Sequence, residues 1–181
     1  RPDDAKAQLL LADVLSWGGS YKEAAEIYRK LRQANPDDEQ LALRLARVLL
    51  WEKDYDAALK RFQMLLDKDF RDPELWRGFV DAAASADKVD PRYKPTALKI
   101  YERVSANVPN DPVFLARLAW VLRRVGETQK SIDLLETALA INPNSQQTIL
   151  QLAEALYDAG RVAEAKEYFE EILKRTKKPR P

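Results

Sequence analysis

The chain repeats itself with a period of 34 residues, and this period constrains its fold more than any other feature. The residues that close successive units lie 34, 34, 39 and 34 positions apart along the 181 residues. They are Pro2, Pro36, Phe70, Pro109 and Pro143. An aromatic or leucine position recurs at the same intervals, at Tyr28, Phe62, Tyr101, Leu135 and Phe169. Periods of this length are typical of arrays in which each unit buries its apolar face against its neighbours.

Each unit carries apolar residues at helical spacing. In the second unit, Leu45, Ala46 and Leu49 share one helical face. In Arg71-Asp72-Pro73, an aspartate can cap a new helix while proline occupies the first turn, where its missing N–H costs nothing. We therefore predict two helices of about thirteen residues per unit, joined by a short polar turn.

The register predicts one all-α domain over residues 1–181. Its units are residues 3–36, 37–70, 71–109, 110–143 and 144–177, followed by a tail at 178–181. The third unit is five residues longer, within Asp87–Pro95, and Pro95 is well placed to open the next helix. This insertion is either an indifferent surface loop or a lip that contacts a partner. Lys177 replaces the last proline, and the basic segment Lys174–Pro181 is either a linker or an electrostatic contact.

Composition excludes several classes of function. Lysine and arginine total 30 against 29 acidic residues, so no overall positive field favours nucleic acid as a partner. The sequence has no cysteine and no histidine, which excludes thiol nucleophiles, imidazole bases and Cys/His metal sites. We predict no catalytic residues, no metal, no cofactor and no membrane span in this segment, since no apolar run approaches about 18 residues. The lack of cysteine favours a periplasmic location over a cytoplasmic one.

The repeat pattern resembles the tetratricopeptide repeat family. The family signature W-x2-L-G-x2-Y…A-x3-F…P is matched five times in degenerate form, with its tryptophan kept only at Trp76. The resemblance covers essentially the whole chain. It implies a right-handed α-solenoid of about five helix-turn-helix units, with the first helix of each pair lining a concave groove. Family members typically serve as scaffolds that bind peptides or assemble complexes.

Arginine and tryptophan gather on the face of the first helices that the resemblance assigns to the groove. Residues at i, i+4, i+7 and i+11 share that face. Both residue types combine contact area with planar hydrogen bonding and stacking, as binding sites require. The predicted partner-binding residues are Trp17, Arg44, Arg47, Trp51, Arg77, Arg117, Trp120, Arg123 and Arg124.

A structural role for these arginines is the alternative interpretation. Basic stripes in the second and fourth units alternate with acidic residues in the other three units. Arg47 could pair with Asp13 or Asp81, and Arg117 with Asp81 or Glu154. Such ion pairs would join neighbouring repeats and leave four arginines for a ligand. The four are Arg44, Arg77, Arg123 and Arg124.

Trp17 and Trp51 stand before equivalent turns, in LSWGGSY and LLWEKDY. These segments resemble repeats of bacterial envelope proteins that accompany exopolysaccharide export, whereas slots typical of chaperone-binding members hold Asp13 and Arg44 instead of asparagine. The tryptophans either contribute to a binding surface or pack over the turn against Tyr21 or Tyr55.

We therefore predict a non-enzymatic scaffold that binds a segment of another protein, within an envelope complex for polysaccharide export. The alternative is direct binding of an anionic polysaccharide, because tryptophans stack on sugars and arginines bind carboxylates. Exposed ends of the array also predict self-association.

Overall fold

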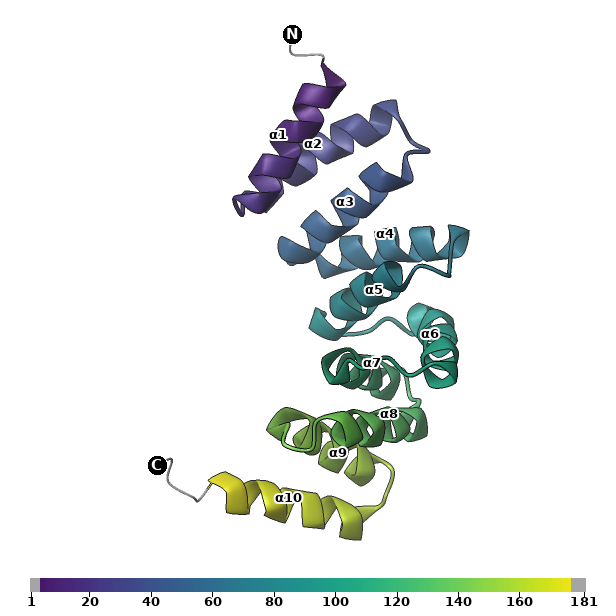
Figure 1. Ribbon diagram of the computed structural model, residues 1–181. Coiled ribbons are helices and arrows are strands. Elements are labelled where there is room, and N and C mark those ends of the chain that lie inside the picture. The colour runs from purple at the N-terminus through teal and green to yellow at the C-terminus, as the bar shows by residue number, and fades with distance from the viewer. Residues whose placement is uncertain (1–3, 177–181) are drawn as a thin grey trace. The chain divides into compact units, whose positions relative to one another are not determined.

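In the computed structural model, the described residues, 4–176, form ten α-helices and one 3₁₀ turn without any β-strand (Figure 1). The predicted pair of helices in each repeat is confirmed. Pro2, Lys177 and the tail at 178–181 lie outside the described residues.

Residues 1–86 and 87–181 form two compact units. The first contains α1 (Ala5–Trp17), α2 (Tyr21–Ala34), α3 (Glu39–Trp51), α4 (Tyr55–Lys68) and α5 (Pro73–Ser85). The second contains η1 (Pro91–Tyr93), α6 (Lys94–Ala106), α7 (Pro112–Arg124), α8 (Thr128–Ile141), α9 (Gln146–Asp158) and α10 (Val162–Thr176). Within each unit, every α-helix packs against the next one along the chain. A single solenoid over the whole chain stays a prediction.

The predicted helix starts are confirmed. Asp72 accepts a hydrogen bond from the backbone N–H of Glu74, and Asp111 accepts one from Phe114, each with proline in the first turn. Asp38 and Ser145 cap α3 and α9 in the same way. These caps satisfy N–H groups that the helix itself leaves without an acceptor.

Buried small residues allow the paired helices to approach closely. Ala12 and Ala24 in the first repeat, and Ala46 and Ala58 in the second, have no exposed surface. Larger residues of the core are also fully buried, among them Phe62. The periodic alanines therefore set the spacing on which every surface of the first helices depends.

The insertion in the third repeat is packed into the fold. Asp90 caps the 3₁₀ turn, and Val89 and Tyr93 are buried. Pro95 lies in the first turn of α6, as predicted. The interpretation of this segment as an indifferent surface loop is wrong, because two of its apolar side chains belong to the core of the second unit.

Candidate functional site

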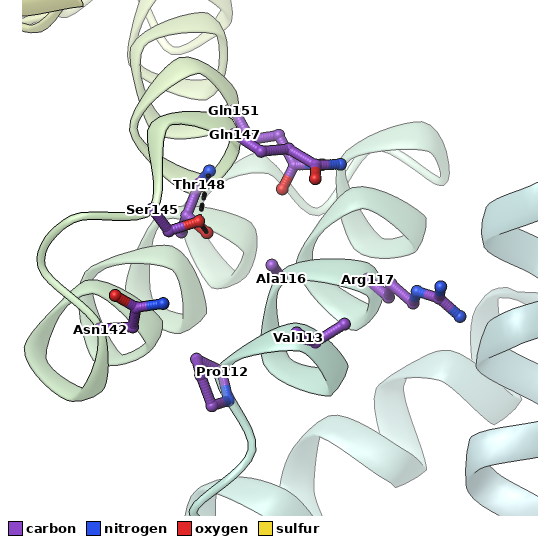
Figure 2. A pocket seen from close by; sticks show the side chains of 9 residues that line it. All are labelled: Pro112, Val113, Ala116, Arg117, Asn142, Ser145, Gln147, Thr148 and Gln151. Atoms are coloured by element: carbon purple, nitrogen blue, oxygen red, sulfur yellow. Dashed lines mark hydrogen bonds between the residues drawn. The ribbon is translucent and has the colours of Figure 1, made fainter. Parts of the chain in front are cut away.

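A pocket of ≈ 120 Å³, lined by both polar and apolar side chains, lies between α7 and α9 in the second unit. These are the first helices of two successive repeats, and they supply most of the lining. Figure 2 shows the nine lining residues, Pro112, Val113, Ala116, Arg117, Asn142, Ser145, Gln147, Thr148 and Gln151. The pocket therefore lies on the face of the first helices that the family resemblance assigns to the groove.

Amides and hydroxyls supply hydrogen-bonding groups in this pocket, beside the apolar side chains of Pro112, Val113 and Ala116. The hydroxyls of Ser145 and Thr148 lie 2.7 Å apart, and Ser145 also caps α9. Gln147 and Gln151 stand at i and i+4 on α9, and both line the pocket (Figure 2). The Gln151 Oε1 atom is buried and accepts no hydrogen bond from the protein. Since each amide offers both donors and acceptors, the pocket can pair with peptide-bond groups of a ligand.

Arg117 provides positive charge at one side of the pocket. Its side chain is exposed, and its guanidinium points away from Ser145 and Thr148 (Figure 2). Further along α7, the Arg124 guanidinium lies 4.9 Å from the ring centroid of Trp120. Arg124 also donates a 2.6 Å hydrogen bond to the backbone carbonyl of Asp87. Trp120 thus presents its ring to an arginine of its own helix.

Arg123 joins α7 to α9. It pairs with Glu154 at 2.9 Å and with Asp158 at 3.6 Å, and its side chain is only 19% exposed. Two carboxylates and substantial burial hold this guanidinium in place. Its role in this structure is to connect successive repeats.

Asp13 forms the centre of a buried polar cluster in the first unit. Its carboxylate accepts a 2.6 Å hydrogen bond from the Tyr28 hydroxyl and pairs with Arg44. Burial raises the pKa of Tyr28 to about 12, and the hydrogen bond to the Asp13 carboxylate acts in the same direction. The cluster links α1, α2 and α3.

The remaining candidates of the first unit are spread over its surface. Trp51 packs against Tyr21 with 5.7 Å between ring centroids, so the predicted packing of a tryptophan over a turn is confirmed for Trp51. Trp17 is 81% exposed. Arg47 pairs with Glu74 at 3.2 Å, and Arg77 is half-buried on α5.

Arg44, Arg123 and Arg124, the arginines expected to be left over for a ligand, each have a partner within the protein. Their role in binding stays a prediction. Ion pairs do connect neighbouring repeats, but Asp13 pairs with Arg44, one turn before the Arg47 that the stripes suggested. Side-chain length and helix rotation decide which cation reaches which carboxylate, and periodicity specifies neither.

Gln147 and Gln151 were not among the predicted binding residues. They stand at i and i+4 on α9, so the helical stripe already contained the signal. The prediction favoured arginine and tryptophan by residue type and therefore passed over the two amides.

Residues 4–176 contain no cluster of acidic side chains placed to hold a metal ion. None of the helices described for this chain combines the length and apolar character needed to cross a bilayer.

Comparison with known proteins identifies relatives of this fold. A sequence model described as tetratricopeptide repeat matches residues 18–80 and 122–181. No curated protein sequence matches the chain.

Several solved structures share the fold. A crystal structure of MamA protein has a TM-score of 0.74 and 20% sequence identity, covering 96% of this chain and 92% of that chain. MamA 41-end from Desulfovibrio magneticus RS-1 has a TM-score of 0.75 and 18% identity, covering 98% of each chain. A MamA AMB-1 structure has a TM-score of 0.76 and 16% identity, covering 99% of this chain and 96% of that chain. At such identities the likeness establishes the fold, which is the predicted all-α solenoid class.

Proposed function

The chain belongs to the tetratricopeptide repeat family, and we propose that it is a non-enzymatic scaffold that binds an extended segment of another protein between α7 and α9. Membership of the family supports a role in protein–protein interaction. Tetratricopeptide domains are generally non-catalytic, and we assign no reaction to the chain. The observation that carries the proposal is the amide-lined pocket on the first helices of the second unit.

An extended segment suits this pocket because its backbone presents N–H and C=O groups that helices and sheets normally satisfy internally. A ligand N–H would supply the donor that Gln151 Oε1 lacks within the protein. Leaving such a buried acceptor unsatisfied costs about 1–3 kcal/mol, so a bound peptide would recover part of that free energy.

A displayed library of random peptides tests the proposal without a known partner. We expect selected peptides to bind the wild-type chain and to lose about tenfold in affinity with Gln151→Leu. The matched control is Gln129→Leu, because Gln129 is exposed on α8 and bonded to Asp133. Failure to select any peptide, or selected peptides that bind Gln151→Leu as well as the wild type, would contradict the proposal.

Binding of an anionic polysaccharide in a bacterial envelope complex is the second candidate function. It is favoured by the exposed ring of Trp17, a residue type that stacks on sugars. The context of polysaccharide export and the periplasmic location rest on the LSWGGSY and LLWEKDY segments and on the absence of cysteine. Titration with uronate oligomers should quench the fluorescence of Trp17 saturably, and Trp17→Phe should remove the response. An unsaturable signal would rule this candidate out.

A further inference from the structure

Three arginines converge on a pocket of ≈ 300 Å³ in the first unit, away from the site described above. Arg29 and Arg32 come from α2 and Arg61 from α4, and Leu45 and Gln33 complete the lining. All three arginines are half-buried. Cations held this close, and partly shielded from water, repel one another unless an anion lies among them.

The described part of the chain supplies no such anion. Within residues 4–176, no carboxylate forms an ion pair with any of the three guanidinium groups; Arg32 donates only to the backbone carbonyl of Asp38, at 3.3 Å. Burial lowers the pKa of Arg61, and repulsion from Arg32 and Arg29 lowers it further. Elsewhere in the described chain, arginines such as Arg44, Arg47 and Arg123 are matched with carboxylates. This cluster therefore carries an uncompensated charge that folding alone does not require.

We propose that Arg29, Arg32 and Arg61 form a binding site for a doubly charged oxyanion of the phosphate class. Arginine presents planar pairs of N–H donors that match the oxygens of a phosphate group. A dianion would both accept these bonds and remove the repulsion among the three cations. The group arrives either as free phosphate or on a phosphorylated segment of a protein, and the chemistry of recognition is the same.

The test measures binding and stability at constant ionic strength. Isothermal titration with inorganic phosphate, and separately with a short phosphoserine peptide, should show saturable binding to the wild-type chain. If the peptide binds more tightly than free phosphate, or if only the peptide binds, the natural ligand is a phosphorylated protein segment. If free phosphate binds more tightly, the natural ligand is the free ion. Arg61→Gln should weaken either interaction by about tenfold or more. Arg71→Gln should not, because Arg71 is an exposed partner of Asp69 on another part of the unit.

Stability provides the second readout. Replacing chloride with phosphate should raise the unfolding midpoint of the wild type more than that of Arg61→Gln. Without phosphate, Arg29→Gln should be at least as stable as the wild type, because one repulsive charge is gone. Equal phosphate responses in the wild type, Arg61→Gln and Arg29→Gln would reveal a general salt effect and overturn the proposal, as would the absence of saturable binding.

A separate observation concerns the surface of α1. Leu11, Val14 and Trp17 form its exposed apolar face, and Val14 is 58% exposed. One repeat later, Leu45 and Val48 occupy the equivalent positions and are at most 1% exposed. There, α2 of the preceding repeat packs against α3. The α1 face therefore has the form of a surface that receives the second helix of a repeat.

The helix α10 presents matching groups. Val162 and Leu173 are 57% and 58% exposed. Val162 stands at the repeat position of Tyr21, the residue that Trp51 packs against, so it would meet Trp17 in an equivalent contact. Leu173 stands at the position of Leu66, which is 2% exposed.

Charges agree with the same register. The pair between Arg47 and Glu74 joins successive repeats. The equivalent positions hold Glu154 in the last repeat, where it also pairs with Arg123, and Lys6 in the first repeat. The signs are reversed but complementary.

We infer that α1 receives α10 of a second copy of this chain, continuing the stacking of repeats head to tail. Such a contact uses two different surfaces, so each copy can bind one neighbour at each end.

Two surface variants test this inference. Sedimentation velocity should show wild-type assembly that grows with concentration, and Val14→Asp and Leu173→Lys should each be monomeric. Mixed together, they should form a 1:1 dimer that grows no further, because each variant retains the face that the other lacks. Met64→Asp, at an exposed apolar residue of α4, should assemble as the wild type does. A wild type that stays monomeric, or a mixture that forms no dimer, would overturn the inference.

Discussion

At the scale of single residues, one aromatic repeat position contacts the next repeat in two different ways. Tyr28 stands there in the first repeat and bonds to Asp13 beside Arg44. In the second repeat the position holds Phe62, and the residue facing it is Gly78. The aromatic residue of one repeat therefore faces Arg44 in the first case and Gly78, which leaves room for the Phe62 ring, in the second. The residue types at these two repeat positions change together.

Gly78→Ala should lower the free energy of unfolding by about 1–3 kcal/mol, because overpacking a buried contact forces side chains from their minima. A Cβ atom at this position would lie 2.2 Å from a ring carbon of the fully buried Phe62. Helix propensity alone predicts the opposite sign, a gain of about 1 kcal/mol. Chemical denaturation measures the difference. The double variant Phe62→Leu/Gly78→Ala should lose less free energy of unfolding than the sum of the two single losses, because the smaller side chain leaves room for the Cβ atom. Losses that simply add would contradict the steric explanation.

Tyr28→Phe should lower stability by about 1–2 kcal/mol at neutral pH, because the buried Asp13 loses a hydrogen-bond donor. The pKa of Tyr28 is raised from 10.0 to about 12 by burial and by the hydrogen bond to Asp13. A raised pKa contributes stability that is complete below pH 10 and is lost as the pH approaches 12. The alkaline decline in wild-type stability should therefore be shallower in Tyr28→Phe, as followed by circular dichroism. Identical alkaline profiles would argue against this role for the hydroxyl.

At the scale of elements, the turn within four of the five repeats contains a residue in the left-handed conformation. Gly19, Gly126 and Gly160 have φ of 83°, 84° and 77° at equivalent positions. The second repeat places Lys53 there instead, at φ 68°. A residue with a Cβ atom pays for this conformation, whereas glycine adopts it readily.

Lys53→Gly should therefore raise the free energy of unfolding by about 1 kcal/mol, the cost of left-handed backbone for a residue with a side chain. Lys53 is exposed, so few contacts are lost with it. Gly126→Lys, at the equivalent turn in the fourth repeat, should lower stability by a similar amount. Thermal and urea denaturation of both variants measure these two changes in the free energy of unfolding. A loss of stability in Lys53→Gly would contradict the argument.

At the scale of the whole molecule, the absence of histidine should make stability insensitive to pH across the neutral range, because no side chain has an ordinary pKa there. On the acid side, hydrogen bonds from Arg71 and Arg92 lower the pKa of Asp69 and Asp90. Lowered pKa values contribute stability that is present above the ordinary value of 3.8 and is lost as the pH falls further. Urea midpoints should thus be level from about pH 5 to 9 and fall below about pH 4. A slope between pH 6 and 8 would contradict this expectation.

Much of the architecture follows from sequence because its causes are local or periodic. The caps at Asp72 and Asp111 need only a few neighbouring residues, and a helical stripe needs only a consistent spacing. The candidate site was predicted less completely. Arg117 lines the pocket as its stripe position suggested, but Gln147 and Gln151 carry its amide chemistry. Residue type alone did not predict the pocket lining, because burial and the neighbouring helix determine which polar atoms of a side chain are available to a ligand.

The sequence alone was sufficient for the helical pairs and the repeat register, since both depend on spacing within about one repeat. Only the tertiary structure specified that Arg44 reaches Asp13 and that Arg123 reaches Glu154. It also showed that Arg29, Arg32 and Arg61 line one pocket without an ion pair to any carboxylate of residues 4–176. Those arrangements join residues from different helices. They depend on helix rotation and side-chain reach, which a one-dimensional period leaves open.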